Sequence, residues 1–140
     1  MSKDTVEIVR RYLDALNRGG SIAVDTVRAF CDPDVVWEDH SDPGEGQRFR
    51  GHEEIERHIE DKYLEELTGP PKEYHFDVEQ LFDTEDEVVA VFNEHHHGWV
   101  SGADISLRVG WVFTFRGSKI VRVQVFPDRE DALRAVGLLS

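Results

Sequence analysis

The chain has 140 residues, a formal net charge of −13 and one cysteine, Cys31. An acidic chain of this kind repels nucleic acid phosphates and anionic lipid surfaces, so we expect neither nucleic acid nor membrane as a partner. The lone cysteine excludes an intrachain disulfide. The sequence has no apolar signal-peptide core near Met1 and no apolar run long enough to span a membrane. Together with the chain length and the lone cysteine, these features predict one cytoplasmic domain over residues 1–140.

The first half of the chain predicts three helices and a short strand. Apolar residues recur at helical spacing between residues 6 and 16, and the glycines at 19 and 20 provide a stop. A second helix begins near Ser21 and carries apolar residues up to Phe30. Val35–Trp37 predicts a strand, which runs into a loop over residues 39–44. A third helix follows His52 and ends at residues 69–71, Gly-Pro-Pro.

The second half predicts four hairpin-linked strands and a last helix. Alternating apolar residues mark strands over residues 74–82, 88–100, 107–115 and 120–126. Asp128 caps a helix from Arg129 to Val136, and Gly137 closes it. We therefore predict an α+β fold. A cone-shaped, strongly curved antiparallel sheet packs against the three helices of the N-terminal half, with a short C-terminal helix. The wide end of a cone is difficult to fill, which predicts a pocket for a small apolar organic molecule.

Five segments of the sequence resemble a known superfamily over nearly the whole chain. They are IVRRYLDALN at 8–17, VWED at 36–39, FRGHEEI at 49–55, WVFTFRGSKIV at 111–121 and DREDAL at 128–133. Together they resemble the nuclear transport factor two-like superfamily and, within it, the SnoaL-like polyketide cyclase group. That superfamily contains isomerases, dehydratases, cyclases, epoxide hydrolases and proteins that only bind. The resemblance therefore implies the fold and leaves the activity open.

Ketosteroid isomerase belongs to this superfamily and suggests which residues carry chemistry. It uses a carboxylate base and an oxyanion hole made by a tyrosine and a protonated aspartate. The resemblance places Tyr12 at the tyrosine and Asp39 at the base, and it places Trp111 at the acid. An indole N–H donates a hydrogen bond but does not reproduce a neutral carboxyl group. Half of the oxyanion hole is therefore matched, which argues against a strict steroid isomerase.

Asp39 and Tyr12 each have two interpretations. Strand alternation puts Val35, Trp37 and Asp39 on one face. If that face points into the cone, Asp39 is a carboxylate beside aromatic walls and is suited to taking a proton from carbon. Otherwise it caps the turn at residues 41–44. Tyr12 either donates a hydrogen bond to a carbonyl or enolate oxygen or is a core tyrosine satisfied locally.

The histidines and the long strand leave further alternatives open. The resemblance places His58 in the pocket, where it could shuttle a proton, although its charged neighbours also fit a solvated helix face. It places Phe92, Glu94 and His96 inward, whereas a count of apolar residues equally favours Val89, Val91 and Trp99. In the triple histidine at residues 95–97, His95 and His97 share one face and could bind zinc as a pair, but the sequence shows no third ligand. No phosphate loop or dinucleotide fingerprint occurs. We expect neither a metal nor a cofactor.

The function therefore stays between three classes. Four residues are most simply core, and they would also form the apolar wall of a pocket: Trp37, Trp111, Phe113 and Val123. The first class is a cofactor-independent isomerase, cyclase or dehydratase with Asp39 as base, and the second is a carrier of a small hydrophobic ligand. The third is a protein whose sheet face mainly serves dimerisation or another partner. The second face of the sheet, with Arg108, Val112, Arg122 and Gln124, predicts the isologous contact of a homodimer.

Overall fold

The computed structural model describes residues 2–18, 20–40, 47–59, 75–97 and 104–139. The helices of this described part are α1 (Ser2–Arg18), α2 (Gly20–Phe30), α3 (Gly51–Ile59) and α5 (Arg129–Ala135). The strands are β1 (Cys31–Asp39), β2 (Gln47–Arg50), β3 (His75–Asp83), β4 (Glu87–His97), β5 (Asp104–Arg116) and β6 (Lys119–Phe126). Among these described helices, none has the length and apolar character needed to cross a membrane.

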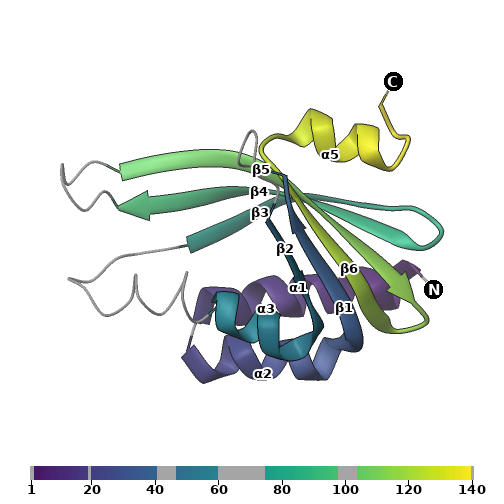
Figure 1. Cartoon of the computed structure of the whole chain (residues 1–140). Coiled ribbons are helices and arrows are strands. Elements are labelled where there is room, and N and C mark those ends of the chain that lie inside the picture. Colours follow the sequence, from purple (N-terminus) through teal and green to yellow (C-terminus); the bar gives the residue numbers. More distant parts are fainter. Residues whose placement is uncertain (1, 19, 41–46, 60–74, 98–103, 140) are drawn as a thin grey trace.

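The strands form one curved sheet in the order β2-β1-β6-β5-β4-β3. Figure 1 shows α1, α2 and α3 beneath one face of the sheet, which we call the inner face, and α5 on the opposite, outer face. The predicted α+β cone with three N-terminal helices and a C-terminal helix is confirmed. One detail was wrong. The sheet is mixed, because β1 pairs with β6 in parallel, and a pairing between distant segments leaves no turn signal in the sequence.

The main hydrophobic core lies between the inner face and helices α1–α3. Alternate residues of β5 enter it as predicted, namely Val109, Trp111, Phe113 and Phe115. In β4, Val88, Ala90 and Phe92 face this core, whereas Val89 and Val91 pack on the outer face with α5. These positions answer, for Val89–Phe92, which alternate residues of β4 face the inside of the fold. A count of apolar residues failed because both faces of the strand are buried.

A register shift between β5 and β6 changes one predicted orientation. Thr114 pairs with Arg122, but Phe115 pairs with Ile120, which leaves Val121 as an extra residue. Ile120, Val123 and Val125 belong to the core, while Val121 borders a groove on the outer face. The simple alternation Val121-Val123-Val125 therefore holds only for its last two members, because a bulge inserts one unpaired residue.

Helix α5 has the ends that the sequence predicts and covers part of the outer face. The Asp128 carboxylate accepts a 2.8 Å hydrogen bond from the backbone N–H of Asp131, and Gly137 adopts a φ of 77° just beyond the helix. Ala132 and Leu133 pack on Val89, Val91 and Val112. The helix approaches β5 closely at Gly110, where an added Cβ would lie 2.6 Å from the Cβ of Ala132.

We expect Gly110→Ala to lower the free energy of unfolding by about 1–3 kcal/mol, because overpacking at this contact pushes α5 away from the sheet. Urea denaturation measures the change. Adding Ala132→Gly removes the clashing atom, although a glycine within a helix itself costs about 1 kcal/mol. A double-mutant cycle should therefore show favourable coupling between the two substitutions. Unchanged stability in Gly110→Ala would contradict the close packing of α5.

Cys31 begins β1 and is buried, with 2% of its surface exposed. Loss of solvation on burial raises the pKa of its thiol to about 12, against the opposing influence of the nearby Lys119 charge. At pH 8 we expect folded protein to react with a thiol reagent on the order of 10³-fold more slowly than urea-unfolded protein. The unfolded chain ionises first as pH rises, so this thiol makes stability fall between about pH 9 and 12. Equal labelling rates in both states would refute its burial.

Candidate functional site

Asp39 is the last residue of β1 and lies at the junction of three strands. Its backbone pairs with Gln47 of β2 and with Val125 of β6. Val35, Trp37 and Asp39 are all buried, in the alternating order predicted from the sequence, and Asp39 is only 6% exposed. The carboxyl group therefore follows Trp37 on the same, inner side of the sheet. An uncovered loop carboxylate would be far more exposed.

Five aromatic side chains pack together on the inner face beside this position. Trp111 is the centre: its ring centroid lies 5.1 Å from that of Trp37, 5.1 Å from Phe92 and 6.1 Å from Phe113. The Trp37 and Phe92 contacts are edge-to-face, a favourable geometry for aromatic pairs. Tyr12 of α1 joins through an edge contact with Phe113 at 5.6 Å. We call these five residues the aromatic cluster.

Strand register relates Asp39 and Val123 to the aromatic cluster. Val125 of β6 pairs with Asp39 on one side and with Trp111 on the other, so one strand separates the carboxylate from the central indole. Two strand spacings amount to about 10 Å between their backbones. Val123 is placed in the same manner between Trp37 and Phe113. The Tyr12 hydroxyl and the indole nitrogens of Trp37 and Trp111 are buried, which puts polar atoms inside an otherwise apolar region.

Several predicted site residues lie where the structure describes only the backbone. His58 belongs to α3, and Glu94 and His96 belong to β4, but their side chains fall outside the described part of the chain. The side chains of the triple histidine at 95–97 share this limit. Over the side chains that are described, no group of three or more His, Cys, Asp or Glu residues could hold a metal ion. The assignments of His58, Glu94 and His96 stay predictions.

A second buried carboxylate has a structural explanation that sequence reasoning missed. Glu56 of α3 is 8% exposed and accepts two hydrogen bonds from the Arg28 guanidinium of α2, at 2.8 and 2.9 Å. Such a bidentate pair satisfies the carboxylate and ties the two helices together. Its members are 28 positions apart, so no local spacing could have revealed it. Asp39 differs from Glu56 in lying beside the aromatic cluster.

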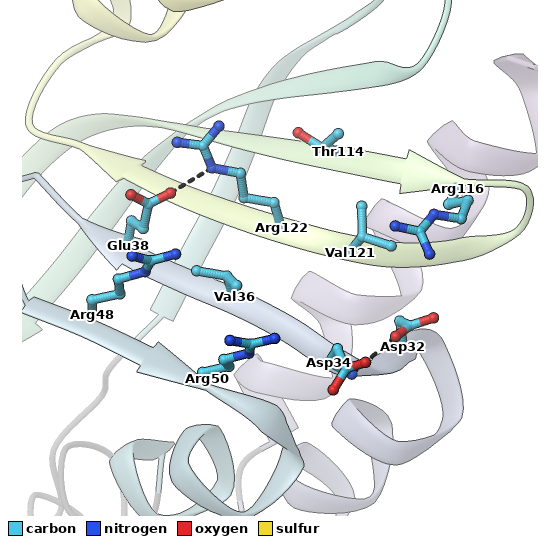
Figure 2. Close-up of a pocket in the computed structure, with 10 residues that line it drawn as sticks. All are labelled: Asp32, Asp34, Val36, Glu38, Arg48, Arg50, Thr114, Arg116, Val121 and Arg122. Atoms are coloured by element: carbon cyan, nitrogen blue, oxygen red, sulfur yellow. Dashed lines mark hydrogen bonds and ion pairs between the residues drawn. The ribbon is translucent and has the colours of Figure 1, made fainter.

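The outer face of the sheet carries a polar groove of about 540 Å³ that sequence reasoning did not locate (Figure 2). It is lined by Asp32, Asp34, Val36, Glu38, Arg48, Arg50, Thr114, Arg116, Val121 and Arg122. The structure also revises the face that the sequence predicted as the homodimer contact. Val112 is covered by α5, and Arg108 is engaged in a 2.7 Å ion pair with Glu79. Of that predicted set, Arg122 lines the groove.

Comparison with known proteins identifies the family. A model of the SnoaL-like domain matches residues 9–123, so the chain belongs to the SnoaL-like family. The fold is also that of solved structures. A protein with a ketosteroid isomerase-like fold from Catenulispora acidiphila, in complex with trimethylamine, is 18% identical. That match covers 96% of this chain and 95% of the other, with a TM-score of 0.71.

Two further structures agree on the fold. A candidate SnoaL-like polyketide cyclase from Jannaschia sp. CCS1 is 20% identical over 96% of this chain and 90% of its own, with a TM-score of 0.72. TerC, crystallised with polyporic acid, is 17% identical over 89% of this chain and 92% of its own, with a TM-score of 0.70. No curated protein sequence matches the chain. At these identities the structural likeness defines the fold and leaves the activity to the residues of the site.

Proposed function

We propose that this SnoaL-like protein is a cofactor-independent isomerase, cyclase or dehydratase that acts on a small, largely apolar or polyketide-like substrate. The observation that carries the proposal is the 6% exposure of Asp39 on the face that also holds the aromatic cluster. Carboxylates are costly to bury, and a buried carboxylate beside an apolar cluster is a frequent property of catalytic bases. Glu56 is also buried, but it lies on α3, where it accepts hydrogen bonds from Arg28, and it does not share the sheet face of the aromatic cluster.

The proposed reaction begins with proton transfer from carbon. The Asp39 carboxylate takes a proton from a carbon next to a carbonyl group, the C–H electron pair forms the enolate, and negative charge develops on the carbonyl oxygen. Donors aimed at that oxygen stabilise it, and the Tyr12 hydroxyl and the Trp111 indole N–H are our candidates. Returning the proton to a different carbon completes an isomerisation. In a cyclisation, the enolate carbon attacks a second carbonyl carbon of the same substrate, the π bond of that carbonyl breaks, and its oxygen takes the proton back from Asp39.

The other proposed members of the site bind or assist. Trp37, Phe113 and Val123 would form the apolar wall. His58, Glu94 and His96 are proposed to line the remaining side. We also propose a cytoplasmic location and a homodimer. The competing function is a carrier that holds the same ligand without transferring a proton.

The ligand class has a direct test by thermal denaturation. We expect neutral ring-containing compounds of terpenoid size to raise the unfolding temperature, because the aromatic cluster offers apolar contact area. At a concentration 100 times the Kd, binding stabilises by about 2.7 kcal/mol. Nucleotides and sugar phosphates are the matched anionic set, and we expect no shift from them because the chain carries a net charge of −13. A larger shift with a nucleotide than with any neutral aromatic compound would contradict the proposal.

A further inference from the structure

The small exposed fractions of the inner-face residues increase toward one end of the sheet. On β5 the exposed fraction increases from 0% at Phe113 to 2% at Trp111 and 5% at Val109. On β6 it increases from 0% at Val123 to 7% at Val125. Phe113 pairs with Val123 and Trp111 pairs with Val125, so the two increases run in the same direction across the sheet.

Strand β1 shows the same increase, whereas β4 does not. Trp37 is 1% exposed, and Asp39, which pairs with Val125, is 6% exposed. On β4, Ala90 and Phe92 are fully buried. A ligand that approaches this end of the sheet therefore contacts β1, β6 and β5, and it reaches the row of residues that contains Asp39 before the row that contains Trp37.

Val125 lies at the centre of this accessible row. Its backbone pairs with Asp39 on one side and with Trp111 on the other. Its carbonyl oxygen accepts a 2.8 Å hydrogen bond from the backbone N–H of His40, which extends the pairing one residue beyond Asp39. Paired residues on neighbouring strands project from the same face, about 5 Å apart. A substrate that contacts both the carboxylate and the indole must therefore lie across the methyl groups of Val125.

The surroundings of Val125 hold its side chain in place. Valine is branched at Cβ, which restricts rotation about χ1. Val125 also belongs to the main hydrophobic core, and its backbone is paired on both sides. An apolar wall of fixed shape discriminates between ligands that differ by one methylene group by about tenfold or more. Val125 is therefore placed to select substrates by shape.

We propose that Val125 is the specificity-determining residue of the site and that it selects flat cyclic ketones. The inference rests on the proposed function, because it takes Asp39 as the base and Trp111 as the donor. One face of the ring lies on the methyl groups of Val125, with the acidic C–H toward Asp39 and the carbonyl oxygen toward Trp111. A substituent that projects from that face lifts the ring away from both groups. The wall residues proposed above lie one row deeper, behind Val125.

Two ketones and two substitutions test this role. The probes are β-tetralone, which is bicyclic and nearly flat, and its derivative with two methyl groups on the carbon between the carbonyl and the aromatic ring, which project from both faces. In isothermal titration calorimetry we expect the unaltered chain to bind β-tetralone at least about tenfold more tightly than the dimethyl derivative. Val125→Ala removes two methyl groups and should reduce this preference about tenfold. Val125→Ile adds one methyl group and should weaken β-tetralone binding about tenfold.

The matched controls are Val35→Ala and Val35→Ile, the same changes at a fully buried inner-face valine of β1. They should lower stability, as measured by urea denaturation, and leave the preference between the ketones unchanged. If both Val125 variants keep the preference and affinity of the unaltered chain, or if the Val35 variants change them equally, the role of Val125 is overturned and the proposed function stands. If neither ketone binds the unaltered chain, the proposed pocket is contradicted, and the selection by Val125 fails with it.

Discussion

Asp39→Asn is expected to reduce turnover by about 10²–10⁴-fold while the protein still binds its ligand. Asparagine retains the size of aspartate and most of its hydrogen bonding, but it does not accept the proton. The free energy of unfolding should hold or rise slightly, because the substitution removes an ionisable carboxyl group from a site that is only 6% exposed. Turnover, ligand affinity and urea denaturation must be measured together on the same preparation.

Glu56→Gln provides the matched control for this substitution. Glu56 is comparably buried, yet it is ion-paired with Arg28 of α2, and neither residue belongs to the aromatic cluster. Its loss should lower the unfolding temperature and leave turnover unchanged. If Asp39→Asn keeps full turnover, Asp39 is not the base, and the interpretation as a turn-capping residue gains support. His58 and Glu94 would then be the next positions to substitute.

Trp111→Ala is expected to destabilise the chain by about 3–5 kcal/mol, the range measured for removal of a large buried aromatic side chain. Trp111 is 2% exposed and contacts the rings of Trp37, Phe92 and Phe113, so its loss leaves a cavity at the centre of the aromatic cluster. Urea denaturation measures the free energy. The conservative change Trp111→Phe retains most of the packing and should cost considerably less.

The two Trp111 variants also separate packing from hydrogen bonding. Trp111→Phe keeps an aromatic ring but removes the indole N–H that we propose as a donor to the oxyanion. Loss of one such donor typically costs about 10²–10³ in turnover. Folded Trp111→Phe with unchanged turnover would exclude this donor role. A loss of less than about 1 kcal/mol in Trp111→Ala would contradict its place at the centre of the core.

Local patterns predicted most of the fold correctly. The alternation of Val35, Trp37 and Asp39 and the Asp128 cap depend on residues close in sequence, and the structure retains them. Features that depend on distant partners were missed or wrong. They are the parallel pairing of β1 with β6, the short strand β2, the bulge at Val121 and the cover of α5 over Val112.

The same distinction between local patterns and distant partners applies to the candidate site. Alternation predicted that Asp39 shares a face with Trp37, and the resemblance added Tyr12 and Trp111 as neighbours. The structure brings Tyr12 and Trp111 into one aromatic cluster through Phe113. Asp39 lies on β1, and strand β6 separates it from Trp111 on β5. The charged groove was not predicted. Its residues come from four strands, and no single segment contains the pattern of paired arginines and aspartates.

Proton exchange at carbon tests the central claim most directly. The ligand that copurifies with the protein, identified by native mass spectrometry, is incubated with the protein in deuterium oxide, and deuterium uptake at carbon is followed by mass spectrometry. If Asp39 is a general base in an apolar pocket, the unaltered protein catalyses uptake and Asp39→Asn binds the ligand without catalysing it. Bound ligand that acquires no deuterium from the unaltered protein, or equal uptake with both proteins, would contradict the account.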